Sequence, residues 1–151
     1  MTSYRIVYGE NTKAAAWCLR EGWQLGSTAQ GIGLERNGEL VALCTFDDYR
    51  GSDIRIHAAK EIAQRFIPRE YLHAVYAYPF IQLGCLRVTA PIVASNVEAI
   101  ALVQRAGFVY ETKLARAARG DDLMIYVLWR ESCRFLAPKW KEKRNAVSMA
   151  D

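Results

Sequence analysis

The chain has 151 residues, of which 52% are hydrophobic and 24% are charged, and its formal net charge is +4. This length suits one domain that buries a core without a disulfide or metal, and the composition excludes a disordered or fibrous protein. The four cysteines contain no Cys-x-x-Cys pair, and two histidines are too few for a common zinc site. We therefore expect reduced thiols, no metal and a cytoplasmic protein.

Membrane and nucleic-acid partners are both disfavoured. The longest uncharged run, 71–86, is interrupted by Pro79 and is shorter than the ~20 apolar residues that span a bilayer. The first residues contain Arg5 and no long apolar core follows them, so we expect no secretory signal. An excess of four positive charges is compatible with a phosphate-bearing ligand but does not by itself indicate nucleic acid.

A hairpin is the clearest element in the first half of the chain. Asn37-Gly38 is the dipeptide best able to adopt positive φ at both positions of a type I′ turn, and it lies between the β-rich runs 32–36 and 39–46. A further strand is indicated by the alternation of apolar and polar residues over 53–58. The elements expected before the hairpin are a strand, a helix and a loop, at 5–8, 14–19 and 26–33.

Helical and strand patterns alternate in the second half. An apolar stripe from Pro68 to Gly84 predicts a helix that Pro79 should kink, because proline donates no bond to the preceding turn. The capping-box sequence Ser95-Asn-Val-Glu98 predicts the start of a second helix. The remaining elements are a strand at 86–90 that should stop or bend at Pro91, strands at 108–114 and 123–129, and a polar loop at 116–122.

Generic catalytic motifs are absent from the sequence. It contains no phosphate-binding Gly-x-x-x-x-Gly-Lys-Ser/Thr loop, no Gly-x-Ser-x-Gly nucleophile elbow and no His-Glu-x-x-His helix. Gly31 and Gly33 lie on a predicted hairpin strand, where we expect them to serve backbone spacing. The function must therefore be sought in the arrangement of the elements.

Four segments carry a family resemblance: the strand 54–59, the segment 78–84, the strand 86–90 and the run Asn96-x-x-Ala-x-x-Leu that leads to Ala-Gly-Phe108. In these the chain resembles the GNAT superfamily of N-acetyltransferases, especially the GNAT-like proteins of bacteriophages and prophages. The resemblance implies a single-domain α/β (α+β) fold over residues 1–138, with a mixed sheet, helices on both faces and splayed central parallel strands. A basic tail, 139–151, lies outside it.

The resemblance implies that acetyl-CoA is the acyl donor and lies where the 54–59 and 86–90 strands splay. Main-chain amides of the first strand would bind the pantetheine arm and polarise the acetyl carbonyl, and the start of the Pro68 helix would bind the pyrophosphate. The residues that this places at the donor are His57, Ala58, Ala59, Gln64, Arg65, Arg69 and Asn96.

The sequence departs from the family pattern at two places. Both glycine positions of the usual phosphate loop carry side chains in the run 64–69, so we expect guanidinium groups to replace some amide contacts there. Val103 stands where many members have a tyrosine that protonates the departing thiolate. Tyr126, on a late strand, is our candidate for that acid, although strand aromatics usually serve packing.

His57 is the candidate general base, because histidine titrates near neutral pH and this one points away from the face that holds Ile54 and Ile56. A hydrogen-bonded packing histidine is the alternative. The acceptor would be an amine of a protein or small molecule, entering near the 26–33 and 116–122 loops. A GNAT scaffold without turnover, encoded by a phage and directed at a host protein, is the rival function; nucleic-acid binding is a third, and a homodimer is left open.

Overall fold

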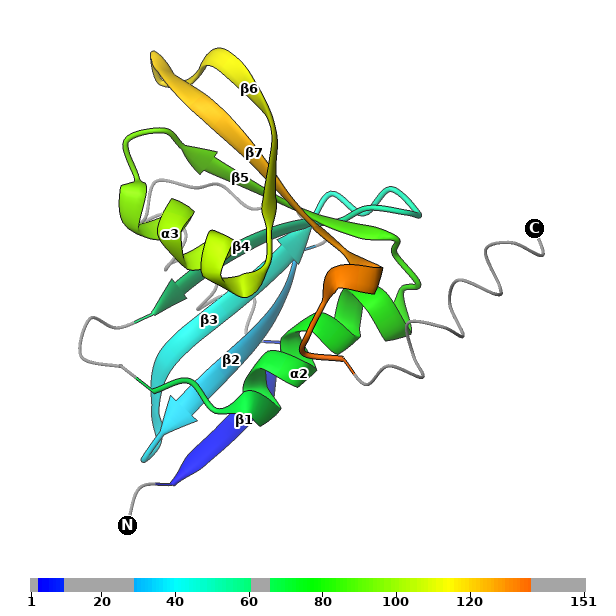
Figure 1. Ribbon diagram of the computed structural model, residues 1–151. Coiled ribbons are helices and arrows are strands. Elements are labelled where there is room, and N and C mark those ends of the chain that lie inside the picture. The colour runs from blue at the N-terminus through cyan, green and yellow to red at the C-terminus, as the bar shows by residue number, and fades with distance from the viewer. Residues whose placement is uncertain (1–2, 10–28, 61–65, 137–151) are drawn as a thin grey trace, which may run out of the picture.

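The computed structural model describes residues 3–9, 29–60 and 66–136, and in these ranges seven strands form one mixed sheet in the order β1-β2-β3-β4-β5-β7-β6 (Figure 1). The strands are β1 (Tyr4–Tyr8), β2 (Gln30–Arg36), β3 (Glu39–Asp47), β4 (Arg55–Lys60), β5 (Arg87–Val93), β6 (Val109–Ala118) and β7 (Asp121–Trp129). All neighbours are antiparallel except β4 and β5. The predicted mixed-sheet fold class is confirmed.

The helices of the described ranges cover one face of this sheet. They are α2 (Arg69–Ala77), the π-helical turn η1 (Tyr78–Gln82) and α3 (Val97–Ala106), and a 3-10 turn, η2 (Arg130–Ser132), follows β7. Figure 1 shows α2 and α3 on the same side of the strands. The helix expected at 14–19 and the tail expected at 139–151 fall outside the described residues, so a helix on the second face stays a prediction.

The core lies between the sheet and these helices. Val75, Tyr76 and Phe80 of the predicted apolar stripe are almost fully buried in a continuous apolar cluster, and so is Tyr71, which the predicted stripe did not include. The Tyr71 hydroxyl donates to the main-chain oxygen of Ile32 at 2.8 Å, which satisfies the one polar group that this side chain brings into the core. The apolar spacing from Pro68 onward therefore identified the buried face correctly.

The predicted hairpin is present in detail. Arg36 pairs with Glu39 around a two-residue turn, in which Asn37 has φ of 52° and Gly38 has φ of 88°. The packing role expected for Gly33 is also confirmed, because a Cβ there would lie 2.7 Å from Leu40 Cδ1 and 3.0 Å from Val7 Cγ2. Three of the cysteines predicted to be reduced, Cys44, Cys85 and Cys133, form no disulfide, whereas Cys18 lies outside the described residues.

Pro79 widens its helix where a kink was predicted. The α-helical pattern ends at Ala77, and the chain continues as a π-helical turn in which the Leu83 amide donates to the Tyr78 oxygen at 3.0 Å. Because proline cannot donate to the carbonyl four residues earlier, the longer hydrogen-bonded ring accommodates it without ending the helix. Pro79 itself is buried.

The expected loop at 116–122 was wrong. Strands β6 and β7 extend through most of it, and the connection is the turn at Arg119 and Gly120, which both have positive φ. Because arginine rarely adopts positive φ, Arg119-Gly120 gives a weaker turn signal than Asn37-Gly38. β6 forms an edge of the sheet, nearly all of its side chains are exposed, and its register shifts near Tyr110 and again after Leu114.

Among the described residues we find no helix with both the length and the apolar character needed to cross a bilayer.

Candidate functional site

The two parallel strands β4 and β5 are joined at a single register position within the described residues, Arg55 opposite Thr89. The Thr89 amide donates to the Ile54 oxygen at 2.9 Å, which fixes the strands at this end. Beyond it, β4 continues to Lys60 and β5 to Val93 without pairing to one another. The structure therefore contains the strand splay that the sequence predicted.

Pro91 gives a chemical reason for the splay. Main-chain groups alternate in direction along a strand, so residue 91, two after Thr89, directs its nitrogen toward β4. The next rung of a parallel ladder would need this nitrogen to donate to Ile56, and proline has no N–H. The strand was expected to stop or bend at Pro91, but it runs on to Val93, because its other edge keeps its pairing with β7 through Ala90 and Ile92.

The same alternation decides which β4 amides face the splay. Main-chain groups along β4 point alternately to its two neighbouring strands. The register shows that they point to β3 at Arg55, His57 and Ala59, and to the β5 side at Ile56 and Ala58. Ala58 is the first residue beyond the rung whose N–H points there without a β5 partner. Of the three residues expected to present amides to the donor, Ala58 is thus the one whose amide faces the splay.

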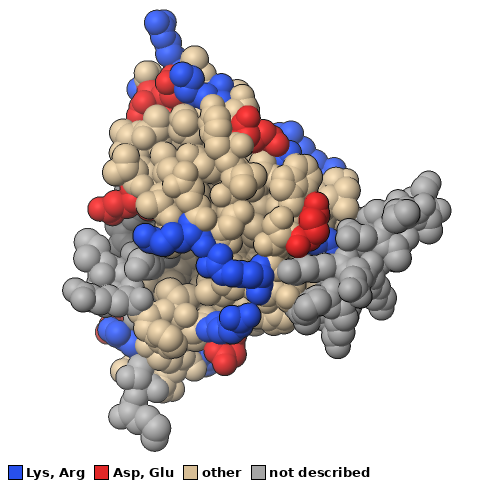
Figure 2. Space-filling model, in the orientation of Figure 1, with Lys and Arg blue, Asp and Glu red and all other residues tan. Residues whose placement is uncertain are grey.

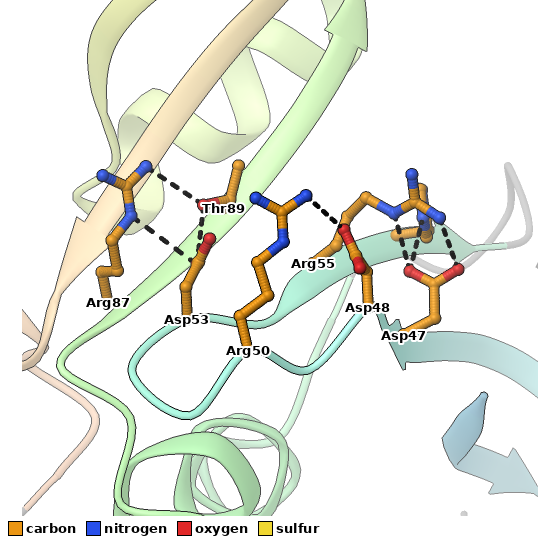
Figure 3. Close-up of polar contacts among 8 residues, drawn as sticks. Asp47, Asp48, Arg50, Asp53, Arg55, Arg87 and Thr89 are labelled. Atoms are coloured by element: carbon orange, nitrogen blue, oxygen red, sulfur yellow. Dashed lines mark hydrogen bonds and ion pairs between the residues drawn. The ribbon is translucent and has the colours of Figure 1, made fainter. Parts of the chain in front are cut away.

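The closed end of the splay is fixed by side chains from three segments (Figure 3). The Thr89 hydroxyl donates to Asp53 Oδ1 at 2.7 Å, and Arg87 Nη2 donates to the Thr89 hydroxyl at 3.1 Å. Arg87 also donates to both carboxylate oxygens of Glu111, at 2.8 and 2.9 Å. Because these groups connect the segment just before β4 with β5 and β6, they hold the strand ends together near the single rung.

His57 lies on β4 with a buried carboxylate beside it. Asp47 of β3 accepts two hydrogen bonds from Arg55, from Nε to Oδ1 and from Nη2 to Oδ2, both 2.7 Å long. The His57 Nε2 atom lies 3.4 Å from the same Oδ1, and the exposed fractions of the two side chains are 4% for His57 and 0% for Asp47. The sequence correctly placed the His57 side chain on the other face of β4 from Ile56. The structure adds Asp47 as its neighbour, and Figure 3 shows Asp47 with Arg55.

The pair Asp47–Arg55 is electrostatically asymmetric. The Asp47 carboxylate is buried, whereas a third of the Arg55 side chain is exposed. The hydrogen bond with Asp47 raises the pKa of Arg55 against the opposing effect of its partial burial. A buried carboxylate is stable only when it is paired and hydrogen-bonded, and the two hydrogen bonds from Arg55 contribute to that pairing of Asp47.

Asn96 begins α3 and is its N-cap. Its Oδ1 accepts a hydrogen bond from the Ala99 amide at 3.2 Å. The predicted capping box placed the cap one residue earlier, at Ser95, and was wrong. Ser95 instead binds Asp121 of β7: its amide donates to Asp121 Oδ2 at 3.3 Å, and hydrogen bonding from its side chain is the main cause that lowers the pKa of Asp121. The cap uses the oxygen of the Asn96 side chain, which is itself exposed.

Tyr126 is buried in β7, between Ala90 of β5 and Tyr110 of β6. Its ring contacts that of Tyr110 edge-on at 5.8 Å between centroids, and it belongs to the apolar cluster beneath the helices. Val103 of α3 packs against the same cluster. The register thus puts Tyr126 one strand away from the splay, on the helix-covered side of the sheet.

The start of α2 offers main-chain donors. Its N-cap is Pro68 in an extended conformation, with no side-chain cap, and such uncapped first-turn amides suit an anion. Arg69 is exposed and donates to the Arg134 oxygen at 3.4 Å, and Glu70 beside it brings a negative charge. Gln64 and Arg65 fall outside the described residues. Figure 2 shows Lys and Arg side chains gathered across the middle of the face that carries α2 and α3.

No group of three or more His, Cys, Asp or Glu side chains that could hold a metal occurs within residues 3–9, 29–60 and 66–136.

Sequence reasoning missed two residues of the site, Asp47 and Arg55, and the role of a third, Pro91. Asp47 ends the predicted hairpin strand and Arg55 alternates with Ile54 and Ile56, so a register for β3 and β4 was the signal that would have paired them.

Comparison with known proteins settles the fold. No family model matches the chain, and no curated protein matches it. Solved structures do. A spermidine N-acetyltransferase mutant from Vibrio cholerae matches with a TM-score of 0.68 at 11% identity, over 91% of this chain and 99% of that one. The chain has the GNAT fold.

Two further GNAT-fold structures are similar over most of their length. A putative acetyltransferase from Salmonella typhimurium, yncA, solved with acetyl-CoA, has a TM-score of 0.63 and 16% identity over 89% of this chain and 97% of that one. The N-acetyltransferase PseH from Campylobacter jejuni has a TM-score of 0.60 and 10% identity over 83% and 97%. At such identities the likeness establishes the architecture, and the chemistry has to be argued from the residues of this chain.

Proposed function

We propose that the protein is an N-acetyltransferase that uses acetyl-CoA and an amine acceptor, which bind together. The observation that carries the proposal is the single rung between β4 and β5, which leaves the Ala58 amide facing an unpaired strand edge within the GNAT fold. A main-chain donor fixed in a sheet suits the stabilisation of a developing oxyanion, because it needs no reorganisation during the reaction.

The donor site is assigned to residues at both ends of the splay. Acetyl-CoA would supply an activated acyl group on a thiol leaving group. The Ala58 amide would bind the acetyl carbonyl, the Asn96 amide group would donate to the pantetheine arm, and the start of α2 with Arg69 would bind phosphate. The uncapped Pro68 start and the basic surface of this face fit these roles, whereas Glu70 disfavours a strongly charged anion.

His57 is proposed as the base that prepares the amine. Its imidazole takes one proton from the acceptor ammonium, and the neutral nitrogen then bonds to the acetyl carbonyl carbon while the carbon–sulfur bond breaks. The second proton lost from that nitrogen ends on the sulfur, and the proton on His57 passes to solvent, so charge and atoms balance. Tyr126 or water is proposed as the group that protonates the sulfur; the buried position of Tyr126 favours water.

The acceptor side is the sheet face opposite the helices, where His57, Asp47 and Arg55 lie. Asp47 and Arg55 bring charges of both signs to this face, so neither a protein amine nor a small-molecule amine is favoured. We propose a cytoplasmic location from the reduced thiols. A link to bacteriophage proteins and a homodimer are proposals that rest on the sequence resemblance alone.

Calorimetric titration of the purified chain with acetyl-CoA tests the proposal. We expect micromolar binding, a loss of affinity of about 3- to 10-fold in Arg69→Gln, and no change in Arg119→Gln, which removes an exposed arginine from the β6–β7 turn. A panel of amines with detection of released CoA thiol then identifies the acceptor. Absence of binding at millimolar acetyl-CoA would overturn the enzyme and leave the GNAT-scaffold binding protein as the function.

A further inference from the structure

We infer that the tip of the β6–β7 hairpin binds an acidic segment of a partner protein through the guanidinium groups of Arg116 and Arg119. The inference goes beyond the proposed function, because it stands for an acetyltransferase and for a scaffold protein without turnover alike. The hairpin tip consists of residues 114–121, and Figure 1 shows that it projects beyond β5 and α3. Figure 2 shows positive side chains standing out at this end of the molecule.

Both arginines adopt a backbone conformation that suits other residues. The angle φ is 59° at Arg116 and 50° at Arg119, in the left-handed region that asparagine and glycine occupy easily and arginine does not. Another two-residue turn of this sheet shows the usual solution, because Asn37 occupies the position that Arg119 has here, and glycine follows both. A sequence selected only to turn the chain would place asparagine at these positions. The arginines therefore indicate a use of their side chains.

An irregularity in β6 sets the position of Arg116. Between Leu114 and Ala118 this strand has three residues, whereas the facing stretch of β7 has only Asp122. The extra residues leave the Arg116 amide without a ladder partner, and the Asp122 carboxylate accepts its hydrogen bond at 3.0 Å. Bulges re-aim the side chain of the residue that they contain, and Arg116 is exposed.

The carboxylates of this region are engaged with the fold. Asp121 accepts hydrogen bonds from the main-chain amides of Ser95 and Asp122, at 3.3 and 2.8 Å. The Asp122 carboxylate lies 3.6 Å from Lys113 Nζ. The Asp122 main-chain oxygen accepts from the Ala94 amide at 2.9 Å, which anchors the hairpin to the connection between β5 and α3. The hairpin tip is therefore a fixed support for the side chains that it carries.

The two guanidinium groups are left for a partner. Arg116 and Arg119 are exposed, and neither side chain forms a hydrogen bond or ion pair with any part of the chain that the structure describes. Positions 115, 117 and 118 are alanines, so little side-chain bulk stands beside the arginines along β6. A guanidinium binds a carboxylate through two parallel hydrogen bonds. Two such groups on a fixed turn suit a segment that carries neighbouring carboxylates.

The charge balance favours a protein over a nucleic acid as the partner. The charged side chains within 113–122 are Lys113, Arg116, Arg119, Asp121 and Asp122. Three are positive and two are negative, which leaves an excess of one positive charge. Nucleic-acid binding draws much of its strength from neutralising several phosphates along a backbone, and so small an excess does not suit it. Leu114, which is 47% exposed, adds an apolar contact that suits a peptide.

The double variant Arg116→Asn/Arg119→Asn separates binding from folding. Asparagine suits positive φ, so we expect this variant to unfold at a higher temperature than the unchanged protein. A lower unfolding temperature would show that the arginines serve the fold, and it would overturn the inference. Arg50→Gln/Arg105→Gln is the matched control, because it also removes two exposed arginines and leaves the chain with the same net charge.

Octaglutamate is the probe for the acidic segment. NMR titration of the isotopically labelled full chain at low salt should shift the amide signals of the hairpin tip and leave those of the rest of the molecule in place. We expect the affinity to fall at least ~10-fold in the Arg116→Asn/Arg119→Asn variant, and to change little in the control. Added salt should weaken the binding, because the contacts are exposed charges.

The inference fails if octaglutamate does not bind at millimolar concentration, if the shifts centre elsewhere on the molecule, or if the test and control variants lose affinity equally. A short DNA duplex that binds the tip more tightly than octaglutamate would assign it to phosphate instead. Self-association of the unchanged protein that the test variant abolishes, measured by sedimentation, would assign it to a second copy. Both results would overturn the acidic partner. None of these readouts uses acetyl-CoA, so they stand apart from a failure of the proposed function.

Discussion

At the scale of single residues, Glu111 shows how one exposed carboxylate depends on its partner. Arg87 donates to both of its oxygens, and this hydrogen bonding lowers the pKa of Glu111 below its ordinary value, against the opposing effect of its slight burial. A carboxylate whose pKa is lowered by folding contributes stability that is complete above its unfolded pKa and is lost as pH falls through its native pKa. The contribution of Glu111 should therefore be complete at neutral pH and be lost in acid, as the pH falls through its lowered native pKa.

Glu111→Gln tests this expectation. The substitution should lower the free energy of unfolding by less than about 1 kcal/mol at pH 7, because the pair is largely exposed, and by a smaller amount at pH 3, where more of the Glu111 carboxylate is protonated. Urea denaturation at the two pH values measures the difference, and Glu131→Gln, an exposed glutamate of η2, is the control. An equal loss at both pH values would show that the side chain acts through packing and not through its charge.

Sequence reasoning reached part of the site at this scale. His57 was identified because alternation along one strand is enough to place its side chain opposite Ile56. Asp47 was not, because its relation to His57 depends on the register of two strands and on which groups are buried between them. Asn96 was named from its resemblance to a family position, and its cap was assigned one residue early because Ser95 is bound by Asp121, which lies far along the chain.

At the scale of elements, Pro91 is the residue on which the splay depends. Pro91→Ala restores an N–H opposite the Ile56 oxygen and permits a second rung between β4 and β5. We expect the variant to be more stable to heat, because a strand edge that was unpaired becomes paired. We also expect it to bind acetyl-CoA at least ~10-fold more weakly, because the paired edge no longer offers the Ala58 N–H as a hydrogen-bond donor.

Calorimetry and thermal unfolding measure the two effects of Pro91→Ala. Ala90→Gly is the reference, since it changes a neighbouring β5 residue that directs its main chain to β7 and leaves the β4 edge untouched. Unchanged acetyl-CoA affinity, together with a demonstrated hydrogen bond from the new amide at position 91 to the Ile56 oxygen, would show that acetyl-CoA does not bind at this strand edge.

Most elements followed from local patterns, and the two exceptions that involve proline share a cause. The hairpin turn, the apolar stripe of α2 and the alternation of β4 are local properties, and each was predicted correctly. Pro79 and Pro91 were both read as interruptions. In the fold, each lies where its missing N–H is tolerated: one in a π-helical turn, the other at a strand edge without a partner. Sequence shows that a donor is missing, whereas only the fold shows whether one is needed.

At the scale of the whole molecule, β6 presents an open edge that invites pairing with other chains. Its exposed apolar side chains include Val109, Tyr110 and Leu114, and its protection consists of register shifts and cations such as Lys113. Charged and irregular edges oppose strand pairing between molecules. Lys113→Val should therefore increase self-association, as measured by light scattering over a concentration series.

Lys113→Arg keeps the charge and is the control for that experiment. Lys113 also forms a 3.6 Å ion pair with Asp122 of β7, so a small loss of stability is expected in Lys113→Val. Association that rises equally in both variants would show that the charge at position 113 does not protect this edge.

The single rung at Thr89 also has a mechanical consequence. The sheet consists of two antiparallel leaves, β1 to β4 and β5 to β7, with α2 in the connection between the leaves and α3 in the connection from β5 to β6. Rotation of one leaf against the other about this hinge would strain this rung and the nearby bonds from the Leu86 and Arg87 amides to the Ser52 oxygen, while every antiparallel rung inside each leaf survives. The stiffness of the sheet therefore lies within the leaves, and its compliance lies between them.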